Sequence, residues 1–155
     1  MEYSQEEFIA LINSTRAGSV WEILDITLVT AEKDKVVATM PIGPYHRQQI
    51  GYLHGGVSVV LAESLASLGS VLNIDATKQM ALGLEINANH LRPKREGMLT
   101  GVATPIALGR TTHVWDIKIT DENDKLVCIS RCTVAVVNRP PDSDSPLIKS
   151  MSGVG

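Results

Sequence analysis

Apolar and polar residues follow one another along this chain in runs that predict a short helix, two strands, a long helix and four more strands. Ser4 precedes Glu7 by three residues and an apolar stripe follows, which is the capping-box pattern of a helix start. The β-rich apolar run over residues 20–30 predicts the first strand, and the alternation over residues 35–41 predicts the second. A loop rich in Gly, Pro and polar residues separates these strands from the long helix.

The long helix is predicted over residues 54–73, which are apolar on nearly every side and rich in small residues. A helix that is apolar all round is a buried helix. Four strands are then predicted at residues 80–92, 98–108, 111–120 and 125–137. The breaks between these strands are short, which favours antiparallel neighbours joined as a meander. The fold class is therefore α+β, with one buried helix wrapped by an antiparallel sheet.

The length of 155 residues suits one domain with a sizeable core. We expect that domain to span residues 1–138, followed by a disordered tail over residues 139–155, which are rich in Pro, Ser and Gly. A single sheet covers only one side of the long helix. A second copy of the chain would extend the sheet and cover more of the helix, so a homodimer is expected.

Charge and cysteine usage exclude several classes of protein. A net charge of −3 gives no electrostatic footprint for nucleic acid, and the longest apolar run, residues 56–74, contains Glu63 and several serines, so no membrane span is expected. Cys128 and Cys132 lie four apart in one predicted strand, roughly 13 Å between Cα atoms, which is too far for a disulfide. Metal-ligand spacing is absent. With an acidic N-terminus unlike a signal peptide, the sequence predicts free thiols, no metal and a cytoplasmic location.

His54, Gly55 and Gly56 precede the long helix and form a candidate anion-binding turn. Glycines let a ligand approach the backbone closely, and the first N–H groups of a helix have no partner within it. Such donors bind anions and can stabilise the oxyanion that forms when a carbonyl is attacked. A tight turn without any ligand is the alternative interpretation.

Glu63 lies in the middle of the predicted helix with apolar neighbours. A carboxylate is rarely buried without a partner, so Glu63 is a candidate base or nucleophile, and an exposed stripe of the helix is the alternative. Ser67 follows four residues later on the same face. Its hydroxyl is placed to hold a water or the carboxylate, or to bond back to its own helix.

The spacing of Gly55 and Glu63 has a consequence for any shared site. Eight residues in one helix span roughly 12 Å, so one carbonyl cannot touch both residues from a single chain. If both act on the same carbonyl, they belong to different subunits. The spacing therefore predicts a composite site at a dimer interface.

The stretch GYLHGGVSVVLAESLAS, residues 51–67, closely resembles the hotdog-fold acyl-CoA thioesterases of the branch that acts on 4-hydroxybenzoyl-CoA and 1,4-dihydroxy-2-naphthoyl-CoA. The similarity extends over about residues 20–137, and its further matches are ILDI at 23–26, ATMP at 38–41, GLEINANHLR at 83–92, REG at 95–97 and LGR at 108–110. The resemblance implies the hotdog fold, hydrolysis of an aromatic acyl-CoA thioester in menaquinone biosynthesis, no cofactor beyond the coenzyme A of the substrate, and dimers that pair into tetramers.

The resemblance also implies roles for individual residues. Glu63 matches the catalytic carboxylate, and Gly55 matches the backbone N–H that polarises the thioester carbonyl. Gln48 matches a side chain near the thioester and the attacking water, His54 helps to shape or polarise the site, and Ser67 matches a hydroxyl that positions water. Residues expected near the coenzyme A lie in the glycine turn and around the end of a strand: Gly56, His90, Arg92, Lys94 and Arg95. A solvated turn is the alternative for the three basic residues.

Two other functions on the same fold stay open. A hydratase or dehydratase of acyl thioesters would need a His–carboxylate pair, for which His54 is the candidate histidine. A non-catalytic acyl-CoA-binding regulator would carry a DNA-binding helical domain, but only ~18 residues precede the first strand. The sequence departs from the resemblance at Gln49-Ile50, where we expect a Pro-aromatic step beside the acyl pocket.

Overall fold

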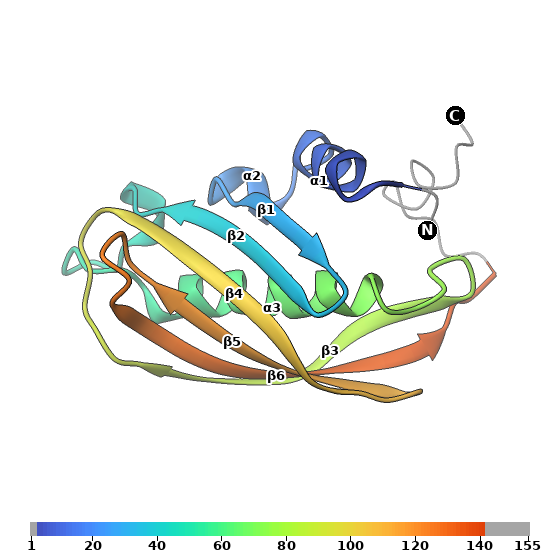
Figure 1. Ribbon diagram of the computed structural model, residues 1–155. Helices are drawn as coiled ribbons and strands as arrows, with labels where there is room; N and C mark the ends of the chain where they lie inside the picture. The colour runs from blue at the N-terminus through green and yellow to red at the C-terminus, as the bar shows by residue number, and fades with distance from the viewer. Residues whose placement is uncertain (1–2, 142–155) are drawn as a thin grey trace.

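A six-stranded antiparallel sheet curls round one long helix in the computed structural model, which describes residues 3–141 (Figure 1). The helices are α1 (Gln5–Ser14), the single turn α2 (Val20–Ile23) and α3 (Gly55–Val71), with a 3-10 turn η1 at Pro44–His46. The strands are β1 (Thr27–Glu32), β2 (Lys35–Pro41), β3 (Gln79–His90), β4 (Met98–Leu108), β5 (Thr112–Thr120) and β6 (Leu126–Asn138). The arrangement is α+β, as predicted, and matches what the family resemblance implies.

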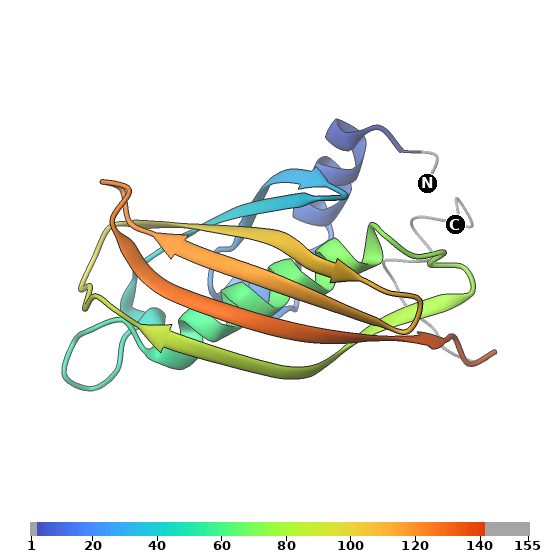
Figure 2. The same ribbon diagram turned by 60° about the horizontal axis from the view of Figure 1, so that its bottom comes forward.

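The order of strands in the sheet is β1-β2-β4-β5-β6-β3, with every neighbouring pair antiparallel. The predicted meander is confirmed for β4, β5 and β6 but is wrong for β3, which pairs with β6 from Gln79↔Asn138 to His90↔Cys128. After β3 the chain crosses the end of the curled sheet before it enters β4 (Figure 2). A short connection indicates opposite strand directions, and in a strongly curled sheet it does not require adjacent strands.

Helix α1 covers the outer edge of the sheet at β1. Its predicted capping box is present: Glu7 N–H donates to Ser4 Oγ at 3.2 Å, and Ser4 N–H donates to Glu7 Oε2 at 2.8 Å. Asn13 bonds to both backbone groups of Leu28, at 3.0 and 2.9 Å, where the β1–β2 register shifts. The side chain therefore satisfies backbone groups that an irregular edge strand would leave open.

The predicted strand over residues 20–30 is wrong in its first half, where the chain forms the helical turn α2. Asp25 ends this turn with a φ of 47°. The Arg16 guanidinium holds the corner by donating to Asp25 Oδ1 and to the Ile26 carbonyl, both at 3.1 Å. These polar contacts outweigh the β propensity of the apolar residues in the turn, because β propensity depends strongly on context.

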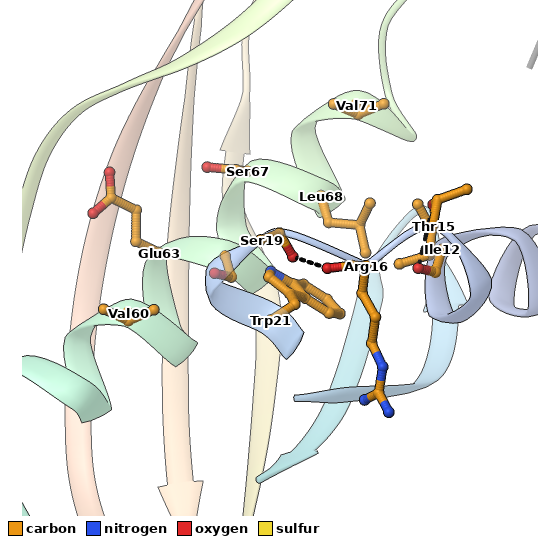
Figure 3. Close-up of a pocket in the computed structure, with 11 residues that line it drawn as sticks. Ile12, Thr15, Arg16, Ser19, Trp21, Val60, Glu63, Ser67, Leu68 and Val71 are labelled. Carbon is orange, nitrogen blue, oxygen red and sulfur yellow. Dashed lines mark hydrogen bonds between the residues drawn. The ribbon is translucent and has the colours of Figure 1, made fainter. Parts of the chain in front are cut away.

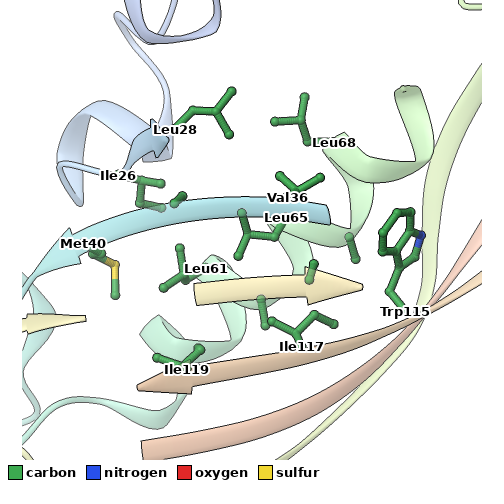
Figure 4. Close-up of a cluster of buried hydrophobic side chains, with 14 of the residues drawn as sticks. Ile26, Leu28, Val36, Met40, Leu61, Leu65, Leu68, Trp115, Ile117 and Ile119 are labelled. Carbon is green, nitrogen blue, oxygen red and sulfur yellow. The ribbon is translucent and has the colours of Figure 1, made fainter. Parts of the chain in front are cut away.

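The core fills the space between the concave face of the sheet and α3 (Figure 4). Its buried residues are mostly aliphatic, and Trp115 and Phe8 are the aromatic ones among them. The indole of Trp115 lies over Gly69 of α3, and its Nε1–H donates to Ser70 Oγ at 2.9 Å. The largest fully buried aliphatic side chains include Ile26, Leu28, Met40, Leu61, Leu65, Leu99, Ile117 and Ile119.

Only the sheet side of α3 is fully buried. On the opposite side a stripe of residues at helical spacing is half-buried in the single chain: Val60, Glu63, Ser64, Ser67 and Val71. The prediction of a helix apolar and buried on every side therefore holds for one face only. The stripe is mixed in character, and it carries the carboxylate that the sequence singled out.

Cys128 and Cys132 are buried free thiols, as predicted, on the face of β6 that packs toward the core. None of the helices within residues 3–141 has both the length and the hydrophobicity to cross a bilayer. The backbone still follows the sheet at Arg139, whose N–H donates to the Lys78 carbonyl at 2.8 Å. The predicted tail beyond residue 141 lies outside the described residues.

Candidate active site

Two separate cavities lie along α3, and each is lined by some of the candidate residues. The first, the helix-start pocket, has a volume of about 360 Å³ and lies at the N-terminus of α3; among its lining residues are Gln48, Tyr52, Gly55, Ser58, His90, Arg92 and Val127. The second, the mid-helix pocket, has a volume of about 480 Å³ and lies between α3 and the segment from α1 to α2 (Figure 3). Its lining residues are Ile12, Thr15, Arg16, Ser19, Trp21, Val60, Glu63, Ser64, Ser67, Leu68 and Val71.

Gly55 brings the backbone of the first helical residue into the helix-start pocket. As the first residue of α3 it has no acceptor for its N–H within the helix, and no hydrogen bond found within residues 3–141 uses this N–H. The His90 ring packs against it so closely that a Cβ at position 55 would lie 2.7 Å from His90 Nε2. A larger residue at position 55 would have to displace the His90 ring, whereas glycine leaves a free donor with helix-dipole support beside Gln48 and Arg92.

His54 and Gly56 shape the turn, but neither residue lines one of the two pockets. His54 is the N-cap of α3, and its Nδ1 accepts the Gly56 N–H at 2.9 Å. That N–H is therefore occupied. The buried His46 stabilises the turn, because its carbonyl accepts the His54 N–H at 2.8 Å. His46 Nδ1 in turn accepts from the Gly43 N–H at 3.1 Å.

The three basic residues do not form one cluster. Lys94 Nζ lies 3.3 Å from Asp121 Oδ2 and 2.9 Å from Glu122 Oε1, and its side chain is only 16% exposed. The hydrogen bond with Glu122 is the main reason that the pKa of Lys94 is raised. Lys94 is thus engaged by carboxylates of the β5–β6 turn, and it ties that turn to the segment after β3.

Arg92 and Arg95 remain for a phosphate-bearing ligand. Arg92 lines the helix-start pocket. Arg95 is exposed, and its guanidinium carbon lies 4.1 Å from the centroid of the Tyr52 ring, a cation–π distance. Because Tyr52 also lines the pocket, both arginines are associated with the helix-start pocket, whereas Lys94 is not.

Glu63 and Ser67 lie together in the mid-helix pocket, and Figure 3 shows their side chains leaving α3 in the same direction. The Glu63 carboxylate packs against Gly83 of β3. The thiol of Cys132 is close enough to Glu63 for the charge of the carboxylate to affect the pKa of the thiol. Burial raises the pKa of Cys132 to about 11, and the negative charges of Glu63 and Glu85 add to the effect.

Sequence reasoning missed Gly83, Trp21 and Ser58. Gly83 lies at a register shift of β3 and leaves room for the Glu63 carboxylate; a glycine inside a strand is a general sign of such close approach. Trp21 was hidden in a run that predicted a strand. Ser58 is 1% exposed, and its hydroxyl has no hydrogen-bond partner among the described residues although it lines the helix-start pocket; its apolar surroundings in the sequence gave no signal.

The single chain does not bring Gly55 and Glu63 together. Helix α3 is continuous from Gly55 to Val71, so the offset of eight residues between Gly55 and Glu63 corresponds to roughly 12 Å. The two residues line different cavities. Within residues 3–141, no group of three or more His, Cys, Asp or Glu side chains is placed to hold a metal ion. One cavity thus contains a backbone donor at Gly55, and the other contains a carboxylate with neighbouring hydroxyls.

Known proteins resemble this chain over most of its length. The family model described as the thioesterase superfamily matches residues 50–128, which contain both glycines of the turn and Glu63. A 1,4-dihydroxy-2-naphthoyl-CoA hydrolase from Listeria monocytogenes is 51% identical over 115 residues, covering 74% of this chain and 93% of the relative. The protein of the same name from Escherichia coli is 41% identical over 137 residues, covering 88% of this chain and all of the relative.

The fold has a close structural counterpart as well. The crystal structure of a mutant thioesterase from Pseudomonas aeruginosa superposes with a TM-score of 0.82 at 42% sequence identity, covering 90% of this chain and 97% of the other. The hotdog fold, the half-buried carboxylate on its central helix and these relatives lead to one conclusion: this chain belongs to the thioesterase superfamily and is a thioester hydrolase.

Proposed function

We propose that this thioesterase hydrolyses an aromatic acyl-CoA, with 1,4-dihydroxy-2-naphthoyl-CoA as the first candidate, and that Glu63 is its base or nucleophile. The observation that carries the proposal is the pairing of features along α3. An unused N–H at Gly55 lies at one point of the helix, and a half-buried carboxylate with a neighbouring hydroxyl lies at another. Two relatives that bear the name of this hydrolase support the choice of acyl group.

The proposed assembly is a homodimer formed through β3 and the open side of α3. Of the two sheet edges, β1 is covered by α1, whereas within residues 3–141 β3 has β6 as its one strand partner. The free edge is twelve residues long and carries exposed apolar side chains, with Leu82 45% and Leu84 64% exposed. Long exposed edges are normally covered in native proteins. A second copy pairing here would cover the half-buried stripe of α3, and two such dimers would give a tetramer.

In this dimer the catalytic groups come from both chains. The Gly55 N–H of one subunit donates to the thioester carbonyl oxygen and stabilises the negative charge that develops there. Glu63 of the other subunit either takes a proton from an attacking water or attacks the carbonyl carbon itself to form an anhydride that water then hydrolyses. Either route breaks the C–S bond, and coenzyme A leaves as the thiol. Gln48 and Ser67 hold the water.

The coenzyme A moiety is proposed to lie along the helix-start pocket. His90 and Arg92 contact it there, and Arg95 supplies a second positive charge for its phosphates. No cofactor is proposed beyond the coenzyme A of the substrate. We further propose a role in menaquinone biosynthesis and a cytoplasmic setting, which suits two buried cysteines that are not bonded to each other.

The alternative functions have less support in the geometry. A hydratase or dehydratase would need a histidine beside the carboxylate. His54 is instead the exposed N-cap of α3, with its Nδ1 committed to the Gly56 N–H, and none of the residues lining the mid-helix pocket is a histidine. A non-catalytic acyl-CoA-binding protein would have no need for Glu63, so its substitution distinguishes the two cases.

The experiment is thiol release from a panel of 1,4-dihydroxy-2-naphthoyl-, benzoyl-, 4-hydroxybenzoyl-, phenylacetyl- and fatty acyl-CoA. Wild type is compared with Glu63→Gln and with Glu32→Gln, the same substitution at an exposed carboxylate on β1. We expect Glu63→Gln to lose ~10²-fold or more in kcat and Glu32→Gln to match wild type. Absence of turnover throughout the panel, or full activity of Glu63→Gln, would reject the proposal.

A further inference from the structure

We infer that Trp21 is a specificity-determining residue, whose indole forms an aromatic wall of the acyl pocket and favours flat aromatic acyl groups over aliphatic chains. The inference rests on the proposed function, because it takes the mid-helix pocket as the place of the acyl group. Trp21 shares that pocket with Glu63 and Ser67 (Figure 3). In the proposed reaction Glu63 acts on the thioester carbonyl, so the acyl group bonded to that carbonyl lies next to this pocket.

The lining of the mid-helix pocket suits a planar acyl group that carries hydroxyls. One wall is apolar, formed by Val60, Leu68 and Val71 of α3. Hydroxyl groups are supplied by Ser64 and Ser67 from the same helix and can bond to polar substituents of the ring. The volume of about 480 Å³ exceeds what a short aliphatic acyl group fills. The indole of Trp21 offers the flat, electron-rich surface on which an aromatic ring stacks.

The position of Trp21 depends on the helical turn α2. The side chains of Val20 and Ile23 in this turn are 44% and 63% exposed, whereas Trp21 is half-buried and packs against the core. In a continuous strand over the same residues, Trp21 and Ile23 would share one face. The turn separates them, so that Trp21 lines the pocket and Ile23 does not.

Polar contacts around α2 hold this arrangement in place. The Gly18 N–H donates to Glu22 Oε2 at 2.6 Å, and the Ile26 N–H donates to the Trp21 carbonyl at 2.9 Å. Arg16 fastens the end of the turn through Asp25 and the Ile26 carbonyl. These hydrogen bonds fix the backbone that carries the Trp21 indole. A side chain that forms a wall of a binding site needs such a rigid support.

The first test compares Trp21→Ala, Trp21→Phe and the matched control Ile23→Ala, which truncates an apolar side chain on the same turn. kcat/KM is measured for benzoyl-CoA, 1,4-dihydroxy-2-naphthoyl-CoA and hexanoyl-CoA. Trp21→Ala is expected to lower the ratio of aromatic to hexanoyl kcat/KM by about 5- to 30-fold, chiefly through KM, with partial recovery in Trp21→Phe. Ile23→Ala is expected to keep the wild-type ratio. An equal loss on all three substrates, or no change in the ratio, would overturn the inference.

The second test measures binding by tryptophan fluorescence and is read together with the turnover of the wild type. The chain has two tryptophans, and Trp115 is fully buried with its Nε1–H bonded to Ser70. Titration with a non-hydrolysable thioether analogue of benzoyl-CoA is expected to change the fluorescence of wild type and Ile23→Ala but not of Trp21→Phe. If the wild type hydrolyses aromatic substrates through Glu63 and Trp21→Phe still shows the fluorescence change, the inference is rejected but the proposed function is not. Wild type without aromatic turnover would reject the proposed function, and the inference with it.

Discussion

The carboxylate of Glu63 and the backbone of Gly83 are in direct contact: a Cβ added at Gly83 would collide with Glu63 Oε1. The helix and the edge strand are therefore fitted to each other at the proposed catalytic group. The backbone of Gly83 is not in the left-handed region, so its conformation does not itself demand glycine. Glycine at this position instead leaves the space that the Glu63 carboxylate occupies.

This contact predicts that Gly83→Ala impairs catalysis more than stability. The colliding atom is the end of a flexible side chain, so it can swing away at little cost, but the carboxylate then leaves its position. A misplacement of about 1 Å can cost on the order of 10²-fold in rate. We expect kcat to fall about 10- to 100-fold while the Tm changes by no more than a few degrees. Gly43→Ala, where an added Cβ would meet only ordinary contacts with His46, is the control. Unchanged kcat in Gly83→Ala would show that the carboxylate position is not critical.

The contact between Gly69 and Trp115 predicts that Gly69→Ala impairs stability more than catalysis. A Cβ at Gly69 would lie 2.5 Å from Trp115 Cη2, and this ring is fully buried and cannot move freely. Although Ala is favoured over Gly in a helix by about 1 kcal/mol, we expect Gly69→Ala to lower the free energy of unfolding by about 1–3 kcal/mol, because overpacking costs that much. Urea denaturation measures it. Ser64→Ala on the half-buried stripe, expected to stay within about 0.5 kcal/mol of wild type, is the comparison, and a stabilised Gly69→Ala would contradict the packing described.

Lys94 and Arg92 are expected to differ in what they contribute. Removing Lys94 leaves Asp121, which is only 6% exposed, without its cationic partner, so Lys94→Ala should lower the Tm with little change in KM. Arg92→Ala should raise KM for acyl-CoA about 3- to 10-fold with an unchanged Tm, consistent with a lost phosphate contact. Thermal unfolding and steady-state kinetics on the two variants check both statements. A higher KM for Lys94→Ala together with a normal Tm would restore Lys94 to the coenzyme A site.

The buried thiol of Cys132 predicts a loss of stability at high pH. Burial raises its pKa from an ordinary value of 9.0 to about 11, so above pH 9 the unfolded chain loses this proton while the folded chain keeps it. The contribution to stability is full below pH 9 and is lost as the pH rises through 11. Urea unfolding at about pH 8 and 10.5 should show a steeper loss in wild type than in Cys132→Ala, since other groups titrate alike in both. Equal slopes would mean that Cys132 titrates as an exposed thiol.

Local patterns in the sequence were sufficient for some elements and insufficient for others. The capping box at Ser4 and the strand at Lys35–Pro41 follow from residues close in the chain, and both are confirmed. The place of β3 beside β6 depends on how the sheet curls round α3, which no short-range pattern records. The turn α2 depends on Arg16, which reaches a carbonyl ten residues away.

The same distinction holds for the site. Glu63 and Gly55 were identifiable because a carboxylate in an apolar helix and a glycine pair at a helix start are unusual in themselves. Gly83 is important because the Glu63 carboxylate packs against it, and Trp21 because it shares a pocket with Glu63. Both contacts join residues that are far apart in the sequence. The engagement of Lys94 by Asp121 likewise joins residues far apart in the chain. Residue type predicts chemistry, whereas contact partners require the fold.

The measurement that tests the composite site most directly is complementation between two inactive chains. Glu63→Gln and Gln48→Ala are prepared separately, mixed in equal amounts, unfolded and refolded together, and assayed with 1,4-dihydroxy-2-naphthoyl-CoA. If each site takes Glu63 from one chain and Gln48 from the other, random assembly makes about one quarter of the sites fully wild type, and the mixture should recover about a quarter of wild-type activity. Activity no higher than the average of the two parents, in mixtures shown by mass spectrometry to contain heterodimers, would place both residues in one chain's site and contradict the account.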